Sequence, residues 1–279
     1  MQVCNTRAEL AAALAKLTGT RGLVMTMGAL HAGHMALVRA SQAQMDHTVA
    51  TVYVNPLQFA PGEDFDTYPR TPEADFALLA DAGVAVVFAP TDAEMYPRPP
   101  LVRIDPGPVA DILEGASRPG HFAGVLQVVH KVFRLTQPDV AFFGQRDAQQ
   151  LALVRTMVAD LEMGIEIAAV PIVRDPNGLA LSSRNKYLTG TELVRAAGIY
   201  DALTDARDVA LTGASASKIA YAAFNALSAR PGIKIDYVEL VHPETFQKLV
   251  GDYTGPGLLT AAAWVGDTRL IDNLTVQIG

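Results

Sequence analysis

Cysteine is nearly absent from this chain, because Cys4 is the single one among 279 residues. One cysteine excludes an internal disulfide framework and a cysteine-based zinc site, and it fits a reducing compartment. No apolar stretch reaches the roughly 18–20 residues that a bilayer-spanning helix needs. Lys and Arg form no long run, and a formal net charge of −7 would repel nucleic-acid phosphates. We therefore expect no nucleic-acid partner and no membrane segment.

The N-terminal segment from Met1 to Leu17 superficially resembles an export signal. Glu9 interrupts its apolar part, and no small-residue cleavage site follows it. Its Ala/Leu spacing instead predicts an amphipathic helix. Because half of all residues are apolar, the chain can bury a substantial core, and we expect a soluble, cytoplasmic protein.

Apolar runs alternate with helical patterns through residues 1–174, which we assign to a first domain. The runs are short, rich in β-branched residues and bounded by Gly, Pro or Asn, as buried strands are. The expected strands are 22–28, 48–55, 84–90, 139–144 and 165–173, and the expected helices are 35–45, 72–82, 122–136 and 148–160. This alternation predicts an α/β fold with a parallel sheet, helices on both faces, and ligands beyond the carboxyl ends of the strands.

Residues 175–279 show a different order of elements. Two helical patterns, at 191–211 and 216–229, precede apolar runs at 233–241, 257–266 and 268–276. Helices followed by strands predict a smaller C-terminal α+β domain.

The stretch MTMGALHAGH, residues 25–34, places His31 and His34 on either side of Gly33, directly after the first long expected strand. A helix that begins near Gly33 would direct its backbone N–H groups and its positive dipole end toward the ligand edge of the sheet. Two imidazoles there could donate hydrogen bonds to charge that develops on a phosphate. Capping histidines are the alternative for either one alone, but the pair in this context favours an anion site.

Three other stretches carry polar residues that suit the same ligand edge. LALSSRNKYL (179–188) holds Ser182, Ser183 and Arg184, which could wrap phosphates but are also ordinary turn residues. FFGQRDAQQ (142–150) and VNPLQF (54–59) add an arginine and several amides, which could hold a small acid with hydroxyl groups. We find no Walker loop, serine elbow, zinc-type His-Glu motif or dinucleotide fingerprint.

Seven collinear motifs together resemble the pantothenate synthetase family of ATP-dependent ligases, which belongs to the nucleotidyltransferases with a His-x-Gly-His motif. The motifs are TMGALHAGH, YVNPLQF, EDFDTYPRT, HFAGV, PDVAFFGQRDAQQ, GLALSSRNKYL and TRLIDN. The resemblance implies a Rossmann-like ATP- and pantoate-binding domain, a C-terminal lid domain and a homodimer. It implies ATP, (R)-pantoate and β-alanine as substrates and Mg²⁺ as cofactor, with pantoyl adenylate as intermediate and pantothenate, AMP and pyrophosphate as products.

The resemblance also assigns roles to matching positions. The implied ATP-binding residues are Met27, Gly28, Ala29, Leu30, His31, Ala32, Gly33, His34, Gly144, Gln145, Arg146, Asp147, Val173, Leu181, Ser182, Ser183 and Arg184. The candidate catalytic residues among them are His34, His31, Arg146, Ser182, Ser183 and Arg184. The candidate substrate-binding residues are Gln58, Gln150, Asn55 and Tyr68.

Two departures from the family pattern bear on mechanism. Arg146 stands where the family typically has a phosphate-binding lysine, and a planar guanidinium is not equivalent to an ammonium group. The acidic pair that often follows the YPRT motif is thinned to Glu73 and Asp75. We therefore assign no firm protein ligands to Mg²⁺, name Asp75 as a weak candidate, and expect ATP phosphates to hold most of the ion's inner shell.

Three alternative functions share the histidine motif. An adenylyltransferase that moves AMP onto a phosphate would need a basic acceptor pocket, whereas the glutamine-rich stretches suit a neutral hydroxy acid better. A nucleotide-binding module with impaired catalysis is disfavoured because His31, His34, Ser182, Ser183 and Arg184 are all retained. A class I aminoacyl-tRNA synthetase conflicts with the acidic charge and with the lack of a tRNA-binding appendage.

Overall fold

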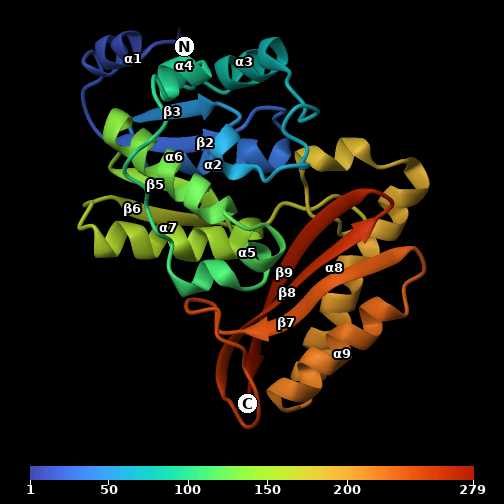
Figure 1. Cartoon of the computed structure of the whole chain (residues 1–279). Coiled ribbons are helices and arrows are strands. Elements are labelled where there is room, and N and C mark those ends of the chain that lie inside the picture. The colour runs from blue at the N-terminus through green and yellow to red at the C-terminus, as the bar shows by residue number, and fades with distance from the viewer. The chain divides into compact units, whose positions relative to one another are not determined.

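The computed structural model describes residues 1–279 and divides them into two compact units (Figure 1). The first unit comprises Met1–Gln145 and Leu153–Pro171, and the second comprises Arg146–Ala152 and Ile172–Gly279. The sequence predicts one boundary between residues 174 and 175. The compact units instead meet between Pro171 and Ile172, and the short segment Arg146–Ala152 is grouped with the second unit. The domain boundary predicted from the sequence stays a prediction.

The first unit contains a six-stranded sheet in the order β1-β4-β3-β2-β5-β6, and all neighbouring pairs are parallel. The strands are β1 (Gln2–Cys4), β2 (Arg21–Thr26), β3 (His47–Val52), β4 (Val86–Phe88), β5 (Val140–Gly144) and β6 (Glu166–Val170). The predicted parallel α/β sheet is confirmed. Strand β1 was missed because three residues are too short to show a hydrophobic period.

Helices pack against this sheet, as Figure 1 shows. They are α1 (Arg7–Leu14), α2 (Ala32–Gln42), α3 (Pro72–Asp81), α4 (Asp92–Met95), α5 (Glu114–Ser117), α6 (His121–Thr136) and α7 (Ala148–Asp160), with 3₁₀ turns η1 (Pro56–Gln58), η2 (Pro108–Asp111) and η3 (Gln145–Asp147). The chain proceeds from β2 to β3 on one side and places β5 on the other side of β2. The carboxyl ends of β2 and β5 therefore mark the switch point where ligands bind in open parallel sheets.

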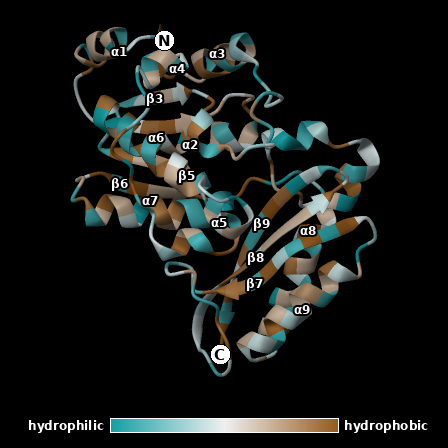
Figure 2. Cartoon of the chain, in the orientation of Figure 1, coloured by the Kyte–Doolittle hydropathy of each residue, from teal (hydrophilic) through white to brown (hydrophobic).

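The second unit combines a three-stranded antiparallel sheet, in the order β7-β8-β9, with two helices. Its elements are η4 (Ser183–Tyr187), α8 (Gly190–Ala210), α9 (Ala216–Ser228), β7 (Ile233–Val241), β8 (Gly255–Val265) and β9 (Thr268–Ile278). Helix α8 begins at a capping box between Thr189 and Glu192. Figure 2 shows apolar residues alternating with polar ones along β7. The predicted α+β character of this region is confirmed.

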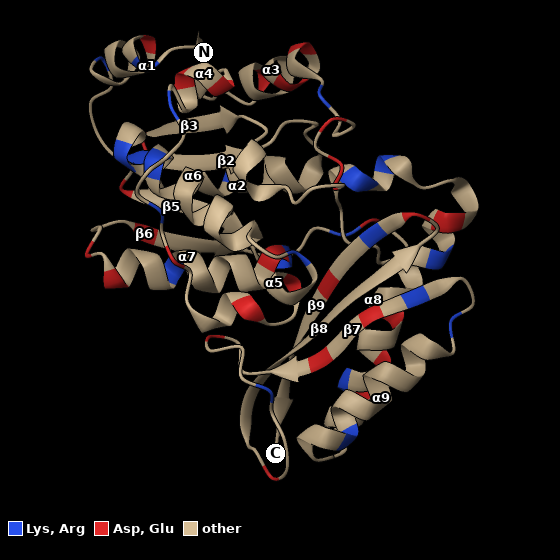
Figure 3. Ribbon diagram, in the orientation of Figure 1, with Lys and Arg blue, Asp and Glu red and all other residues tan.

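Charged residues of both signs are interspersed on the elements in the view of Figure 3. None of the helices combines the length with the apolar character needed to cross a lipid bilayer.

Candidate active site

The loop after β2 carries the first part of the candidate site. Strand β2 ends at Thr26, whose hydroxyl donates to the Thr51 carbonyl (2.7 Å) and accepts from the Gly28 N–H (3.2 Å). Gly28 has φ +82°, a left-handed conformation that glycine adopts without strain. The chain thus turns at the carboxyl end of β2 and enters α2 at Ala32. We call residues Met27–His34 the histidine loop.

A buried carboxylate fixes the middle of the histidine loop. Asp75, only 1% exposed, accepts from the N–H groups of Ala29 (2.9 Å) and Leu30 (2.8 Å) with its two oxygens. The Thr71 hydroxyl donates to the same carboxylate (3.2 Å). A buried charge is costly unless donors such as these satisfy it. These bonds engage both oxygens and give Asp75 a positioning role, while its weak candidacy as a metal ligand stays a prediction.

The two histidines cap the N-terminus of α2. His31 Nδ1 accepts from the Gly33 N–H (3.1 Å), and His34 Nδ1 accepts from the His31 N–H (3.3 Å). A neutral imidazole that accepts at Nδ1 carries its proton on Nε2, so this pattern assigns the Nε2–H tautomer to both rings. The ring centroids lie 4.1 Å apart. Capping and ligand binding are compatible here, because the caps engage Nδ1 while both Nε2 atoms are donors.

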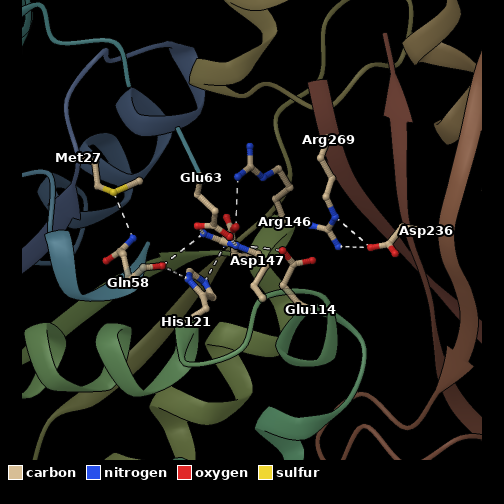
Figure 4. Close-up of polar contacts among 10 residues, drawn as sticks. Met27, Gln58, Glu63, Glu114, His121, Arg146, Asp147, Asp236 and Arg269 are labelled. Carbon is tan, nitrogen blue, oxygen red and sulfur yellow. Dashed lines mark hydrogen bonds and ion pairs between the residues drawn. The ribbon is translucent and has the colours of Figure 1, made fainter. Parts of the chain in front are cut away.

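Asn55 holds the side chain of Gln58 in one orientation. Asn55 Oδ1 accepts from the Tyr96 hydroxyl (3.0 Å), and Asn55 Nδ2 donates to Gln58 Oε1 (3.1 Å). Gln58 must then present Nε2 as its donor, and this atom lies 3.2 Å from Met27 Sδ (Figure 4). Asn55 is 1% exposed and positions Gln58, and its direct contact with substrate stays a prediction.

Helix α6 approaches the Gln58 turn so closely that only glycine fits at residue 124. A Cβ atom on Gly124 would lie 2.0 Å from the Leu57 carbonyl oxygen and 2.6 Å from the Gln58 nitrogen. The Gly124 carbonyl also accepts from Asn55 Nδ2 (3.1 Å). This close packing fixes the backbone of η1 at the point where it carries Gln58.

Arg118 joins Gln58 to an ionic network that sequence reasoning missed (Figure 4). Its Nε and a terminal nitrogen bind Glu63 through both oxygens (2.7 and 2.8 Å), and its other terminal nitrogen lies 3.6 Å from Glu114. The same guanidinium contacts His121 Nε2 (3.1 Å), while His121 Nδ1 bonds to the Gln58 carbonyl (2.8 Å). The signal in the sequence was the HFAGV motif, which contains His121 and to which we assigned no role.

Burial and charge set the ionisation of this network. Burial, with the nearby positive charge of Arg118, lowers the pKa of His121 to about 4. Burial would raise the pKa of Glu63, but hydrogen bonding to Arg118 outweighs it and lowers that pKa. His121 is therefore neutral at pH 7. Its Nδ1–H donates to the Gln58 carbonyl, and its Nε2 accepts from Arg118.

The second unit carries Arg146, which follows the first residue of η3. Its guanidinium donates to the Leu181 carbonyl (3.1 Å) and to Asp147 Oδ1 (3.2 Å), and Figure 4 shows both Arg146 and Asp147. Asn273 Nδ2 donates to the Arg146 carbonyl (2.9 Å). The Nε atom of Arg146 is buried and has no hydrogen-bond partner. Such a group favours an acceptor oxygen of a ligand, because an unsatisfied buried donor is costly.

The predicted serine segment, Leu181–Arg184, leads into η4. Ser182 caps this turn by accepting from the Arg184 N–H (3.2 Å), and Ser183 is 5% exposed. The Leu181 N–H donates to the Val173 carbonyl (2.9 Å). Hydrogen bonds thus link Val173, Leu181 and Arg146 within the second unit, and their contact with a nucleotide stays a prediction.

The roles of four further predicted site residues stay predictions, and the structure gives only their location and burial. Gly144 ends β5, and Gln145 is exposed at the start of η3. Gln150 is half-buried on α7. Tyr68 is buried and packs edge-on against Phe59, with ring centroids 6.0 Å apart.

Comparisons with known proteins agree with the chemistry of these groups. The family model described as pantoate-beta-alanine ligase matches residues 2–275. Pantothenate synthetase from Salinispora arenicola is 50% identical over 279 residues, covering 99% of this chain and 98% of the relative. The corresponding Thermobifida fusca protein is 47% identical, with 99% and 96% covered.

Two solved structures extend the likeness to three dimensions. Pantothenate synthetase from Thermus thermophilus superposes with a TM-score of 0.93 at 46% identity, covering 98% of this chain and 99% of that one. Pantoate-beta-alanine ligase from Francisella tularensis, solved with beta-gamma ATP and beta-alanine, gives 0.81 at 34% identity, with 98% and 97% covered. Together with the histidine caps and the paired amides, these likenesses show that the chain belongs to the pantoate–beta-alanine ligase family, the ATP-dependent ligases of pantothenate biosynthesis.

Proposed function

We propose that this ligase condenses (R)-pantoate with β-alanine through a pantoyl adenylate. A carboxylate oxygen of pantoate attacks the α-phosphorus of ATP, and the bond to pyrophosphate breaks. The β-alanine nitrogen then attacks the acyl carbon, an amide bond forms, a proton leaves the nitrogen, and AMP departs. Adenylation is needed because a carboxylate is a poor acyl donor, whereas AMP is a good leaving group.

The observation that carries this proposal is the paired Nε2–H tautomer of His31 and His34. Two oriented donors at the N-terminus of α2 suit the charge that develops on the α-phosphate and on pyrophosphate. Their Nδ1 atoms are engaged by backbone N–H groups, so the rings are oriented before ATP binds. We assign His34 and His31 to stabilisation of the adenylation transition state.

Within the second unit, a separate set of residues is proposed to bind the phosphates of ATP. Arg146 and Arg184 are permanent cations, and Ser182 and Ser183 add hydroxyl donors. The unsatisfied Arg146 Nε supports a phosphate contact at this residue. We assign the remaining predicted ATP positions to the nucleotide, with Asp147 on the ribose.

Gln58 is proposed to bind pantoate through its Nε2 donor. Its Oε1 is engaged by Asn55, so the amide offers N–H groups to a carboxylate or hydroxyl oxygen of the substrate. Gln150 and Tyr68 stay proposed pantoate contacts, and Asn55 acts through Gln58. A neutral donor suits this substrate, because a permanent cation there would also attract free phosphate.

Magnesium is proposed to enter as part of the Mg–ATP substrate. The chain contains no group of three or more His, Cys, Asp or Glu side chains placed to hold a metal ion. The Asp75 carboxylate is engaged by the histidine loop. We therefore propose that the ATP phosphates hold most of the ion's inner shell, and we route no step through a resident Mg²⁺ site.

The test is mass spectrometry of a reaction that contains the enzyme, Mg–ATP, pantoate and β-alanine, with each component omitted in turn. Pantothenate and AMP should form only when all three substrates are present. Pantoyl adenylate should accumulate when β-alanine is omitted. Tight ATP binding without any AMP would contradict the proposal and favour a nucleotide-binding module, while AMP on a phosphorylated acceptor would favour an adenylyltransferase.

Two properties of the whole protein complete the proposal. We propose a homodimer in the cytoplasm, as the resemblance implies. Light scattering coupled to gel filtration should give twice the chain mass of 29.7 kDa, and fractionation should recover the protein with cytosolic enzymes. A monomer at micromolar concentration would contradict the homodimer.

A further inference from the structure

The C-terminal motif TRLIDN contains two adjacent polar residues that strand β9 buries. Asp272 is 3% exposed and Asn273 is 6% exposed. Neighbouring side chains of a strand point to opposite faces, so one residue of this pair cannot replace the other. Burying a charged carboxylate in a small sheet is costly, and only specific partners compensate for it.

Asp272 binds Arg174 in a fork. The two distances between the carboxylate oxygens and the guanidinium nitrogens are 2.6 and 2.8 Å. The same guanidinium donates to the Gly178 carbonyl (3.0 Å) and to the Asn273 carbonyl (3.3 Å), and it stacks 3.8 Å above the Tyr200 ring. Arg174 is thereby held on several sides, which exceeds what a surface ion pair provides.

Arg174 opens a tight hairpin that ends in the serine segment. Arg174 and Ala180 form an antiparallel bridge, and the Leu181 N–H donates to the Val173 carbonyl (2.9 Å). At the tip, Asp175 Oδ1 accepts from the Leu179 N–H (2.9 Å). Fixing Arg174 therefore fixes where Leu181 and the serines after it begin.

Asn273 holds the backbone of Arg146, the second arginine that contacts this segment. Its Nδ2 donates to the carbonyl of Arg146 (2.9 Å), and the Arg146 guanidinium in turn donates to the Leu181 carbonyl (3.1 Å). The backbone of Arg146 and the serine segment are thus both anchored to adjacent residues of β9. Neither anchor is itself a phosphate-binding group.

We propose that Asp272 and Asn273 are positioning residues, which set the spacing between Arg146 and the serine segment for the phosphates of ATP. This inference rests on the proposed function, because it assumes that Arg146 and the serine segment contact ATP. An anion held by several donors requires them at a defined separation, and a misplacement of about 1 Å can cost roughly 100-fold in rate. The two residues act through other groups and need not touch the substrate.

The test compares Asp272→Asn and Asn273→Ala with wild type by calorimetric titration of Mg–ATP and by steady-state kinetics. Asp272→Asn should raise the ATP dissociation constant and the KM for ATP about 10-fold, within the range of a small misplacement. Asn273→Ala removes one neutral hydrogen bond and should raise both about 3-fold. The KM for β-alanine should stay unchanged.

Glu239→Gln is the matched control, because it changes another carboxylate of the same sheet that pairs with exposed Lys248. It should leave ATP affinity unchanged. A purely structural role for Asp272 would lower kcat in proportion to the folded fraction, with every KM unchanged, and that result would overturn the inference. If Asp272→Asn does not fold, Asn273→Ala decides, since an unchanged ATP affinity there overturns the inference.

Arg146→Ala separates failure of this inference from failure of the proposed function. If Arg146→Ala weakens ATP binding while Asp272→Asn and Asn273→Ala do not, only the positioning inference fails. If Arg146→Ala leaves ATP binding unchanged, the proposed role of Arg146 fails, and the inference fails with it.

Discussion

The histidine loop of the first unit and the serine segment of the second have similar proposed tasks, yet different contacts hold them. The histidine loop is capped by bonds between residues two and three positions apart, and Asp75 binds its backbone from 45 and 46 positions away. The serine segment is held by the Arg146–Leu181 and Arg174–Asp272 bonds, which join residues 35 and 98 positions apart. The first arrangement is local and mostly neutral, whereas the second is long-range and ionic.

This difference predicts that substitutions in the two segments affect stability and activity differently. A local cap can be removed with a limited loss of stability, so substitutions in the histidine loop should mainly affect chemistry. A long-range ionic anchor ties separate segments together, so its loss should misplace groups that it never touches. Each variant below tests one side of that contrast.

The largest effect is expected for His34, on the local side. His34→Ala should lower kcat about 100- to 1,000-fold, the range found when one preorganised transition-state donor is removed. It should cost only about 1 kcal/mol of stability, because the His31 N–H loses its cap. Initial rates of AMP formation and thermal unfolding measure the two effects.

His34→Gln is the matched control for this prediction. Glutamine at the same helix position can accept from the His31 N–H, as in a capping box, but it carries no imidazole N–H. Stability should return to that of wild type while kcat stays low. Recovery of activity in His34→Gln would show that capping, and not transition-state stabilisation, is the role of His34.

Asp75→Asn tests the distant carboxylate that binds the backbone of the histidine loop. The amide would place an N–H group against a backbone N–H of Ala29 or Leu30, which should destabilise the protein by about 1–3 kcal/mol. The melting temperature should fall by roughly 2–4 °C per kcal/mol. The Mg²⁺ concentration for half-maximal activity should not change; an increase would restore Asp75 as a metal ligand. Glu73→Gln changes an exposed carboxylate in the same turn and should leave both the melting temperature and the Mg²⁺ dependence unchanged.

His121 tests whether the first unit also depends on a long-range ionic anchor. Its folded pKa of about 4 lies below its ordinary value of 6.5, so between these values the unfolded chain binds more protons. The free energy of unfolding should therefore fall as the pH is lowered through this window, by about 2 kcal/mol at pH 5 from this group alone. The surrounding charges are Arg118, Glu114 and Glu63.

His121→Gln should remove this part of the pH dependence. Urea unfolding at pH 7.5 and pH 5 should show a smaller loss in the variant than in wild type, because glutamine does not titrate. Equal losses in both proteins would mean that His121 is not held neutral by its surroundings. Arg118 would then be a weaker anchor of Gln58 than the structure indicates.

The same contrast explains what the sequence could predict. The parallel sheet, the α+β region and the turn that carries the two histidines into a helix depend on periodicity and on neighbours within a few residues, and these were predicted. Asn55 stays a predicted substrate contact, but its hydrogen bond to Tyr96, 41 positions away, could not be predicted from spacing. His121 and Arg118 were missed for the same reason, since their role depends on Gln58, at least 60 positions away. The sequence also gives no sign that Asp272 binds Arg174, because the two residues lie 98 positions apart.

Ser182→Ala is expected to have the smallest effect, and it tests the local contact of the serine segment. The variant loses the cap on the Arg184 N–H and one hydroxyl, so the KM for ATP should rise about 3-fold, as for one lost hydrogen bond. Because Arg174 and Arg146 still anchor the segment, stability should fall by less than in His34→Ala. Ser182→Thr keeps the hydroxyl and should behave like wild type in both measurements. If Ser182→Ala instead destabilises the protein more than His34→Ala does, the serine segment is held locally, and the contrast between the two units no longer stands.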